Sequence, residues 1–595
     1  MRKKTAALLA LLLVLSLALG GCLVRLDGKP RSDPQSDPQS DPQSDPQSGT
    51  QSETQSDTQP GDMPRFSRIE YRRPDMAAFS ELYETLIADL EADRLSTREG
   101  VTRLQEAYDA YNDFYTMSTV AELRYHHDIT DSRMAEEYDW CLEQEAQVDQ
   151  LFERLCSASA NCGNAEALDE EFWGGWVVEA YRGQQSATLD EAYLDLVRRE
   201  NALLTEYHRA TADPTVLWQG REQSYLSLEQ DDSISLEDWE EIQELYYDKY
   251  APILGELYIR LVGVRQELAA YLELDSYEDY VYYADYERDF SPQQAETLLE
   301  QIRTELGPLY KELDLNRRWA ELEYTELNEA ENLEALHTAV RKMGGKAFRA
   351  CKDMERYELY DIEISGKKAD LSYQCYLYSY DNPFVFVKTQ GYSDDILNFG
   401  HEFGHFVDAW YNHDATYSHD LAEVFSQGME YLLLSRVPED YRAELTEYKL
   451  LDTVDTFTQQ GSFAAFEHAV YARPAAEWTP EALNRLSLEL ARDYGYLDPE
   501  REDYYAKSWI DVSHFFETPF YVVSYCVSNC AAFELYEKEC AKADAGLECW
   551  SRMLPREHDS FLQTVTEQGG LSDPFAPGRM REVAALLREK LKENQ

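Results

Sequence analysis

Apolar residues recur every three to four positions along most of the chain after Pro64. Clear examples are the segment Met76–Leu86, which follows Asp75, and the segment Trp239–Leu272. This spacing places apolar side chains on one face of a helix, and an acidic residue is a preferred helix cap. We find no repeat of about 20 to 50 residues of the kind that builds solenoids. The pattern predicts a mainly α body.

Strand character appears once, in Tyr373–Tyr380 and Pro383–Lys388, with Asp381 and Asn382 between them. Two such segments joined by a short polar connection predict a small β hairpin. In a peptide-cleaving enzyme, an exposed edge of this hairpin would pair with the substrate main chain, whatever the substrate side chains. A purely structural ribbon fits the pattern equally well.

The N-terminal part of the chain departs from the helical pattern. Basic residues Arg2–Lys4 precede the apolar run Ala6–Leu19, and small residues lead to Cys22. A membrane-spanning helix needs about 20 apolar residues, so this shorter run predicts a bacterial lipoprotein signal over residues 1–22, with the lipid on Cys22. The alternative is an ordinary cleaved secretory signal. Residues 23–62 predict a disordered spacer, because four Asp-Pro-Gln-Ser repeats contain no large apolar side chain.

Composition narrows the possible functions. The chain has 595 residues, 44% of them hydrophobic, and a formal net charge of −59. This charge would repel phosphate backbones and anionic lipid head groups, so we exclude nucleic-acid binding and expect a membrane attachment only through the lipid anchor. The nine cysteines after Cys22 show no paired C-x-x-C spacing. They predict buried thiols rather than a disulfide scaffold or a cysteine metal site.

The segment Asn398–Asp408 contains the pattern H-E-x-x-H in His401, Glu402 and His405. Residues four apart share one face of a helix, so the two imidazoles could hold a single Zn²⁺ ion. Glu402 would point beside the metal, where a general base is needed. A pair of ordinary histidines on a helix surface would give the same pattern.

The residues around this pattern favour a buried helix. Ser393 is the predicted N-cap, and Asp394 and Asp395 would follow in the first turn, where the helix dipole favours negative charge. Polar ligands within an apolar helix suggest a functional role. The apolar residues that flank the histidines are Ile396, Leu397, Phe403, Phe406, Val407 and Trp410.

Two later segments offer further candidates. Glu423 and Glu430 lie seven residues apart on one face of a predicted helix, and zinc with two histidines commonly takes a glutamate as third ligand. His514, Tyr521 and Tyr525 could direct three hydrogen-bond donors toward one place. Buried tyrosines that bond to the backbone would explain the same pattern.

The chain resembles the thimet oligopeptidase and oligoendopeptidase F family of zinc peptidases. The resemblance covers nearly everything after the spacer. The matching segments are Phe66–Asp75, Asn382–Phe386, His401–His405, Glu423–Glu430, Ala465–Tyr471, His514–Tyr525 and Gly570–Phe575.

This resemblance implies a two-lobed helical bowl with a deep active-site channel and a small β ribbon beside the metal helix. The body would span residues 63–595, with an N-terminal lobe over about 63–250 and a catalytic region over about 251–595. The implied activity is endopeptidase cleavage of short oligopeptides. Two alternatives stay open: a peptide-binding lipoprotein without catalysis, and a related helical zinc carboxypeptidase.

The resemblance also implies roles for the candidate residues. His401, His405 and Glu423 would hold one Zn²⁺ ion, and Glu402 would act as general base. The family's local motif favours Glu423 as third ligand, although the interval from His401 is closer to the usual one at Glu430. Glu430 would then orient a ligating histidine. The residues implied to stabilise the oxyanion or hold the substrate are His514, Tyr521 and Tyr525.

Overall fold

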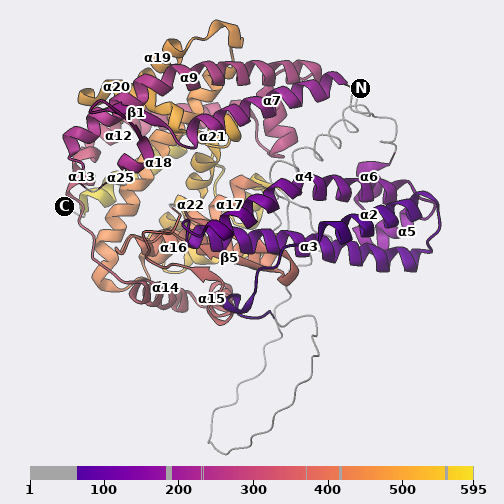
Figure 1. Ribbon diagram of the computed structural model, residues 1–595. Coiled ribbons are helices and arrows are strands. Elements are labelled where there is room, and N and C mark those ends of the chain that lie inside the picture. The colour runs from indigo at the N-terminus through magenta and orange to yellow at the C-terminus, as the bar shows by residue number, and fades with distance from the viewer. Residues whose placement is uncertain are drawn as a thin grey trace, which may run out of the picture.

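The computed structural model describes residues 63–182, 191–229, 231, 233–369, 371–413, 418–556 and 560–593. The predicted signal, the spacer and Cys22 lie outside these residues. Helices dominate the described part of the chain, which confirms the predicted mainly α fold (Figure 1). No helix of this part has an apolar stretch long enough to cross a membrane.

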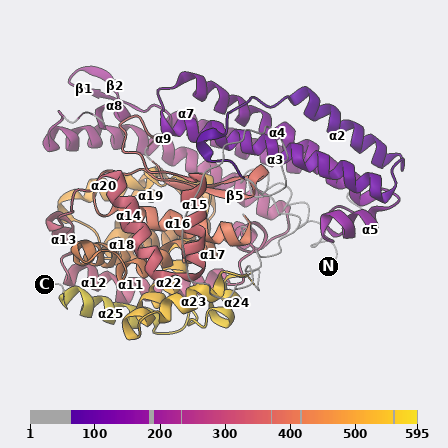
Figure 2. The same ribbon diagram turned by 90° about the horizontal axis from the view of Figure 1, so that it is seen from below.

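The N-terminal helices form a region with an apolar core of its own, and they lie to one side of the molecule in both views (Figure 2). As predicted, Asp75 caps the first long helix by accepting hydrogen bonds from the Ala77 and Ala78 N–H groups, both 3.1 Å long. The elements of this part are η1 (Phe66–Arg68), α2 (Met76–Glu91), α3 (Thr97–His127), α4 (Ser132–Asn161), α5 (Ala165–Leu168), η2 (Asp169–Trp173) and α6 (Val177–Tyr181).

A second, larger core joins the following helices to the C-terminal half of the chain. The predicted helix at Trp239–Leu272 is present, and it continues through residue 250 without a break. The elements from residue 191 to residue 285 are α7 (Glu191–Thr211), β1 (Thr215–Trp218), β2 (Arg221–Ser224), α8 (Tyr225–Glu229), α9 (Leu236–Tyr271), α10 (Tyr277–Tyr280) and η4 (Val281–Asp285).

The hairpin β1–β2 shows that the prediction of a single strand region was wrong. Each strand has only four residues, which are too few to show an alternation of apolar and polar positions in the sequence. Val216 is the only buried residue of β1. The two-residue turn has positive φ at Gln219 (50°) and Gly220 (75°). Such a turn matches the twist of a hairpin, and glycine adopts it without strain.

The remaining elements build the body around the second core. Helices α16, α17 and α22 lie together in its centre (Figure 1). The helices before them are α11 (Pro292–Glu305), α12 (Gly307–Glu312), α13 (Leu315–Glu321), α14 (Glu329–Met343) and α15 (Gly345–Tyr357). The later elements are α16 (Asp395–Asn412), α17 (His419–Leu434), α18 (Glu439–Tyr471), η6 (Ala475–Glu477), α19 (Pro480–Asp493), η7 (Pro499–Arg501), α20 (Glu502–Lys507), η8 (Ser508–Asp511), α21 (Ser513–Glu517), α22 (Val523–Ala541), α23 (Ala545–Met553), α24 (Phe561–Gln563), η9 (Thr564–Gln568) and α25 (Arg579–Glu593).

The predicted hairpin before the motif helix is present, with shorter strands. Strands β4 (Tyr373–Leu377) and β5 (Asn382–Phe386) are antiparallel, and the 3₁₀ turn η5 (Tyr378–Tyr380) joins them. The short strand β3 (Tyr360–Asp361) adds to β5 in parallel, so β4 is at an edge of the sheet.

The outer edge of β4 is partly occupied by the N-terminal region. Thr119 of α3 donates a hydrogen bond of 3.3 Å to the Tyr376 carbonyl oxygen. This carbonyl points away from β5, because residues 384 and 386 are the ones whose backbone faces β4. The outer edge of β4 therefore has at least one backbone acceptor that α3 already occupies.

Candidate metal centre

The motif helix begins differently from the prediction. Asp394 is the N-cap residue without a side-chain cap, and Ser393 does not cap the helix, so that prediction was wrong. The loop before the helix is held instead by Asp395, whose carboxylate accepts hydrogen bonds from the N–H groups of residues 390, 391 and 392. A carboxylate at this end of a helix is favoured by the dipole, as expected for an acidic first turn.

Helix α16 presents His401 and His405 to the neighbouring helix α17. The two imidazole rings lie 5.0 Å apart between centroids, and the six flanking apolar residues named above are buried, as predicted. Gly404 permits this arrangement. A Cβ atom at Gly404 would lie 2.5 Å from the Phe425 carbonyl oxygen and 2.6 Å from the Ser426 Cα atom. A larger residue would therefore push the two helices apart.

Glu423 of α17 lies between the two histidines. Its Oε2 atom is 3.6 Å from His401 Nε2, and its Oε1 atom is 3.9 Å from His405 Nε2. Two imidazole nitrogens and one carboxylate oxygen here lie within 4.8 Å of one another. This is the only such group of potential metal-binding side chains among the described residues.

Glu430 contacts the opposite nitrogen of the first histidine. Its Oε1 atom lies 2.8 Å from His401 Nδ1, and its Oε2 atom lies 2.7 Å from Lys449 Nζ of α18. Burial raises the pKa of Glu430, but Lys449 and the hydrogen bond with His401 outweigh it and lower the pKa below its usual value. Glu430 is therefore ionised and keeps His401 Nε2 directed toward Glu423.

The charge balance of this group favours a bound cation. Burial lowers the pKa of His401, but the hydrogen bond to Glu430 and the charge of Glu423 outweigh it and raise the pKa to about 9. Burial raises the pKa of Glu402 to about 7. Among the described residues, Glu423 forms ion-pair contacts only with the two histidines. Two imidazoles and a carboxylate are a common donor set for zinc, so these residues fit this metal.

Three candidate donors reach the same place from another part of the chain. The Tyr521 hydroxyl lies 3.5 Å from Glu423 Oε1, and the Tyr525 hydroxyl lies 3.5 Å from His514 Nε2. The His514 and Tyr521 rings are 5.2 Å apart between centroids. Burial raises the pKa of both tyrosines, so their hydroxyls remain protonated donors.

Sequence reasoning missed two side chains of this site. His419 lies one helical turn before Glu423, and its ring centroid is 5.4 Å from that of Tyr521. Lys449 balances Glu430 although it is itself buried. The spacing of four residues between His419 and Glu423 could have indicated that His419 lies near the site. Lys449 gives a weaker signal, because it directly precedes the apolar residues Leu450 and Leu451 of α18.

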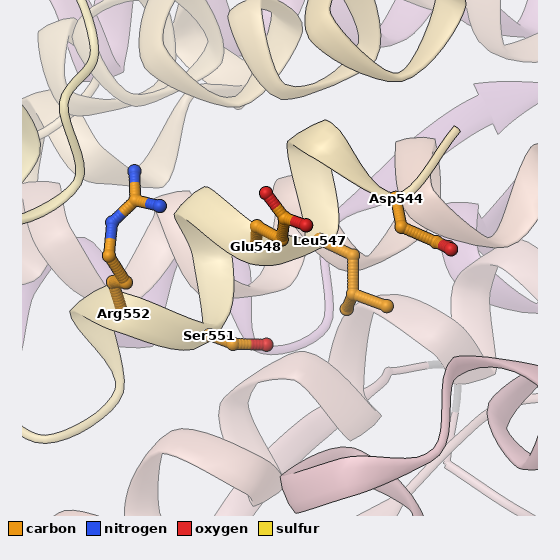
Figure 3. A pocket seen from close by; sticks show the side chains of 5 residues that line it. All are labelled: Asp544, Leu547, Glu548, Ser551 and Arg552. Atoms are coloured by element: carbon orange, nitrogen blue, oxygen red, sulfur yellow. The ribbon is translucent and has the colours of Figure 1, made fainter. Parts of the chain in front are cut away.

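A surface hollow lies on α23 (Figure 3). Its lining side chains come from one helix and the residue before it, and Leu547 is the one among them that packs against the core. The Arg552 side chain already donates a hydrogen bond to the Gly569 carbonyl oxygen. The hollow contains no histidine or tyrosine, and so it lacks the convergent groups of the centre on α16 and α17. It is lined by Asp544, Leu547, Glu548, Ser551 and Arg552.

Two models of one protein family match this chain. The model described as the peptidase M3 N-terminal domain matches residues 66–181, which include the helices of the N-terminal region. The model described as peptidase family M3 matches residues 340–558, which include all the candidate site residues above. Together they cover more than half of the sequence.

Two relatives match a smaller part of the chain. Oligopeptidase PepF of Bacillus subtilis (strain 168) is 24% identical over an alignment of 225 residues, and the match covers 36% of this chain and 33% of the relative. The chromosomal oligoendopeptidase F of Lactococcus lactis subsp. cremoris is 29% identical over an alignment of 174 residues, and the match covers 27% of this chain and 29% of the relative. The chain thus aligns with about a third of the length of these relatives.

Solved structures match over a much larger part. The structure of PZ peptidase A with an inhibitor has a TM-score of 0.68 and 20% sequence identity, and the match covers 89% of this chain and 99% of that one. At this identity the likeness shows a common fold.

Proposed function

The chain belongs to peptidase family M3, and we propose that it is a zinc-dependent endopeptidase that hydrolyses short oligopeptides on the outer face of a bacterial membrane. The observation that carries this proposal is the convergence of His401, His405 and Glu423, with Glu402 beside them on the same helix. A protein that only bound peptides would have no use for a buried general base next to a metal-binding group.

In this proposal His401, His405 and the Glu423 carboxylate would hold the zinc ion. A zinc ion at such a site lowers the pKa of water and polarises a carbonyl group. Glu430 directs the His401 ring, and Lys449 balances the negative charge of Glu430. Ser426 donates a hydrogen bond of 3.0 Å to Glu423 Oε2. These contacts keep the donors oriented before substrate arrives.

Glu402 is the proposed general base. It accepts a proton from the water that attacks the scissile carbonyl carbon, and it delivers this proton to the nitrogen of the leaving amine. Its side chain is 6% exposed, and this burial raises its pKa above the usual carboxylate value, which helps it to hold the proton between the two halves of that transfer. A base with an ordinary carboxylate pKa would hold the proton too weakly to pass it on efficiently.

His514, Tyr521 and Tyr525 are proposed to stabilise the developing oxyanion or to hold the substrate. Both tyrosine hydroxyls are donors, and burial keeps His514 neutral by lowering its pKa. Donors that are oriented in advance stabilise charge at little reorganisation cost in a site with restricted water access.

The location is proposed from the N-terminal sequence. A lipid on Cys22 would hold the protein at the membrane, and residues 23–62 would separate the peptidase body from the surface. The negative charge of the chain is compatible with an exported protein whose only membrane contact is this anchor.

Digestion of a mixed pool of short peptides tests the function. The full chain, kept soluble in detergent, should cut peptides at internal bonds, and a zinc chelator should stop the reaction. Products read by mass separate the alternatives, because a carboxypeptidase would remove single C-terminal residues and a silent binder would leave all peptides intact. Either of these last results would overturn the proposal.

A further inference from the structure

Phe520, the residue directly before Tyr521, has an unusual backbone conformation. Its φ angle is +60°, in the left-handed region. A bulky L-residue rarely adopts this region, because its Cβ atom then lies too close to the following carbonyl oxygen. The surrounding structure must therefore hold Phe520 in place, and any residue that does so also sets the direction of Tyr521.

Both backbone polar groups of Phe520 are bound by buried ionisable side chains. Its N–H group donates a hydrogen bond of 2.9 Å to Glu467 Oε1, and its carbonyl oxygen accepts one of 3.0 Å from Arg288 Nη2. Glu467 is 0% exposed and Arg288 is 4% exposed. Two ionisable groups in the core thus hold the backbone of a single residue on both sides of its Cα atom.

Arg288 also connects Phe520 to the helix that carries Glu423. Its Nε atom lies 3.1 Å from Asp420 Oδ2, and Asp420 is three residues before Glu423 on α17. Its Nη2 atom also donates a hydrogen bond of 2.8 Å to Ser524 Oγ at the start of α22. One guanidinium group therefore links the loop before Tyr521, the helix α22 that begins after it, and α17.

The guanidinium group is rigidly packed. Its Cζ atom lies 4.4 Å from the ring centroid of Tyr282 and 4.8 Å from that of Tyr286. Arginine stacks on aromatic faces with little loss of further freedom, and its donors have a fixed geometry. A flexible lysine at this position could not reach three acceptors in fixed directions.

We propose that Glu467 and Arg288 are positioning residues, which hold Phe520 in its strained conformation and thereby direct the Tyr521 hydroxyl to the centre formed by His401, His405 and Glu423. The inference deepens the proposed peptidase function and rests on it for its kinetic consequences. Neither residue touches the candidate metal-binding atoms, so their contribution passes through Tyr521.

Glutamine is a conservative replacement for Glu467. Burial raises the pKa of Glu467 to about 8, against the lowering effect of the Phe520 N–H bond. The side chain is therefore largely protonated at neutral pH, and a glutamine keeps both its shape and the acceptor for the Phe520 N–H group. A leucine has a similar size but no acceptor.

A double-mutant cycle tests the inference. We expect Glu467→Leu to lower kcat by about 30- to 300-fold with KM within about threefold, since misplacing one donor approaches the cost of losing it. Glu467→Gln should retain kcat within about threefold. In a Tyr521→Phe background, Glu467→Leu should lower kcat by less than about threefold, because residues that act through one group are not additive. Additive losses would overturn the inference.

Hydrogen exchange gives a readout that does not depend on activity. Glu467→Leu should speed amide exchange in residues 518–525, while exchange in α16 and the zinc content stay as in the wild type. If the wild type cleaves no peptide, the proposed function fails, and this measurement still tests the positioning role. Unchanged exchange in residues 518–525 would overturn it.

A second variant covers the case in which Glu467→Leu does not fold. Arg288→Lys keeps the charge near Asp420 but loses the fork that reaches Phe520, and it should lower kcat and speed exchange in the same segment. The matched control is Arg436→Lys. Arg436 is similarly buried, but it lies just beyond the C-terminal end of α17, and its Nη2 atom is 2.7 Å from Glu539 Oε1. This control should lower the Tm without changing kcat. A similar fall in kcat for both arginines would overturn the inference.

Discussion

The central helices α16, α17 and α22 bury most of their residues, whereas the long N-terminal helices α2, α3 and α4 bury fewer than half of theirs, and the kinds of buried side chain also differ. The core of α2 to α6 is apolar, and Asp169, its buried acid, accepts hydrogen bonds from the Val177 and Val178 N–H groups. The central helices bury several carboxylates, among them Glu402, Glu423 and Glu430.

This difference separates stability from chemistry. Burying a carboxylate costs several kcal/mol unless other groups compensate the charge, so an apolar core is the more stable choice. In the central helices the histidines and Lys449 offset this cost by pairing with the carboxylates, and in our proposal zinc offsets it further. Substitutions in the N-terminal core should therefore act on the free energy of unfolding, and those in the centre on metal binding and turnover.

The largest effect is expected from loss of the third proposed ligand. Glu423→Ala should lose most of its zinc and nearly all turnover, because its carboxylate lies between the two histidines. Glu430→Ala should still bind zinc at stoichiometric concentrations, with an affinity lower by about 10- to 100-fold. Glu430 contacts His401 at Nδ1, and the proposed metal-binding atom of His401 is Nε2. Zinc content measured after dialysis checks both. The reverse order of metal loss would transfer the ligand role to Glu430.

Glu402→Gln should keep zinc and lose turnover. Removal of the proton acceptor should lower kcat by about 1,000- to 10,000-fold, while the metal-binding side chains stay in place. Initial rates on one internally cleaved peptide, together with zinc content, measure this. The control is Glu548→Gln on the exposed side of α23, which should have no effect. Near-normal turnover in Glu402→Gln would exclude it as general base.

Tyr521→Phe and Tyr525→Phe should fold normally, and at least one should lose mainly kcat. Loss of one oxyanion donor typically costs about 100- to 1,000-fold. The measurement is kcat and KM for one peptide, with circular dichroism as the folding control. If neither variant changes kcat, the two hydroxyls are parts of the core rather than of the site.

A substitution in the N-terminal core should show the opposite behaviour. Leu104 is 0% exposed within α3, and Leu104→Ala should lower the free energy of unfolding by about 2–5 kcal/mol, from lost apolar burial and the cavity left behind. At a temperature where the variant stays folded, kcat should equal that of the wild type. Denaturant unfolding and peptide kinetics test this. A large fall in kcat in the folded variant would mean that this region shapes the site directly.

Cys22→Ser should have the smallest effect on catalysis. The variant should leave the membrane fraction while it hydrolyses soluble peptides at the wild-type rate, because the spacer separates the anchor from the body. Fractionation of cells followed by peptide assays of each fraction measures both properties. Retention of the variant in membranes would point to another anchor.

Local features of this protein were predictable from its sequence. The helical period, the cap at Asp75 and the common face of His401 and His405 follow from the geometry of a single helix, which needs no other part of the chain. The hairpin β4–β5 was predictable because its two strands are neighbours along the chain, joined by a short turn. Where local signals were short or ambiguous, as in β1–β2 and at Ser393, prediction failed.

The relation between helices was decided only by the tertiary structure. Whether Glu423 or Glu430 faces both histidines depends on how α16 and α17 cross at Gly404, and spacing along the chain cannot express this crossing. The contacts of Phe520 with Arg288 and Glu467 join residues 232 and 53 positions apart. A sequence pattern describes neighbours along one helix, whereas these contacts exist only because packing brings distant segments of the chain together around buried ionisable groups.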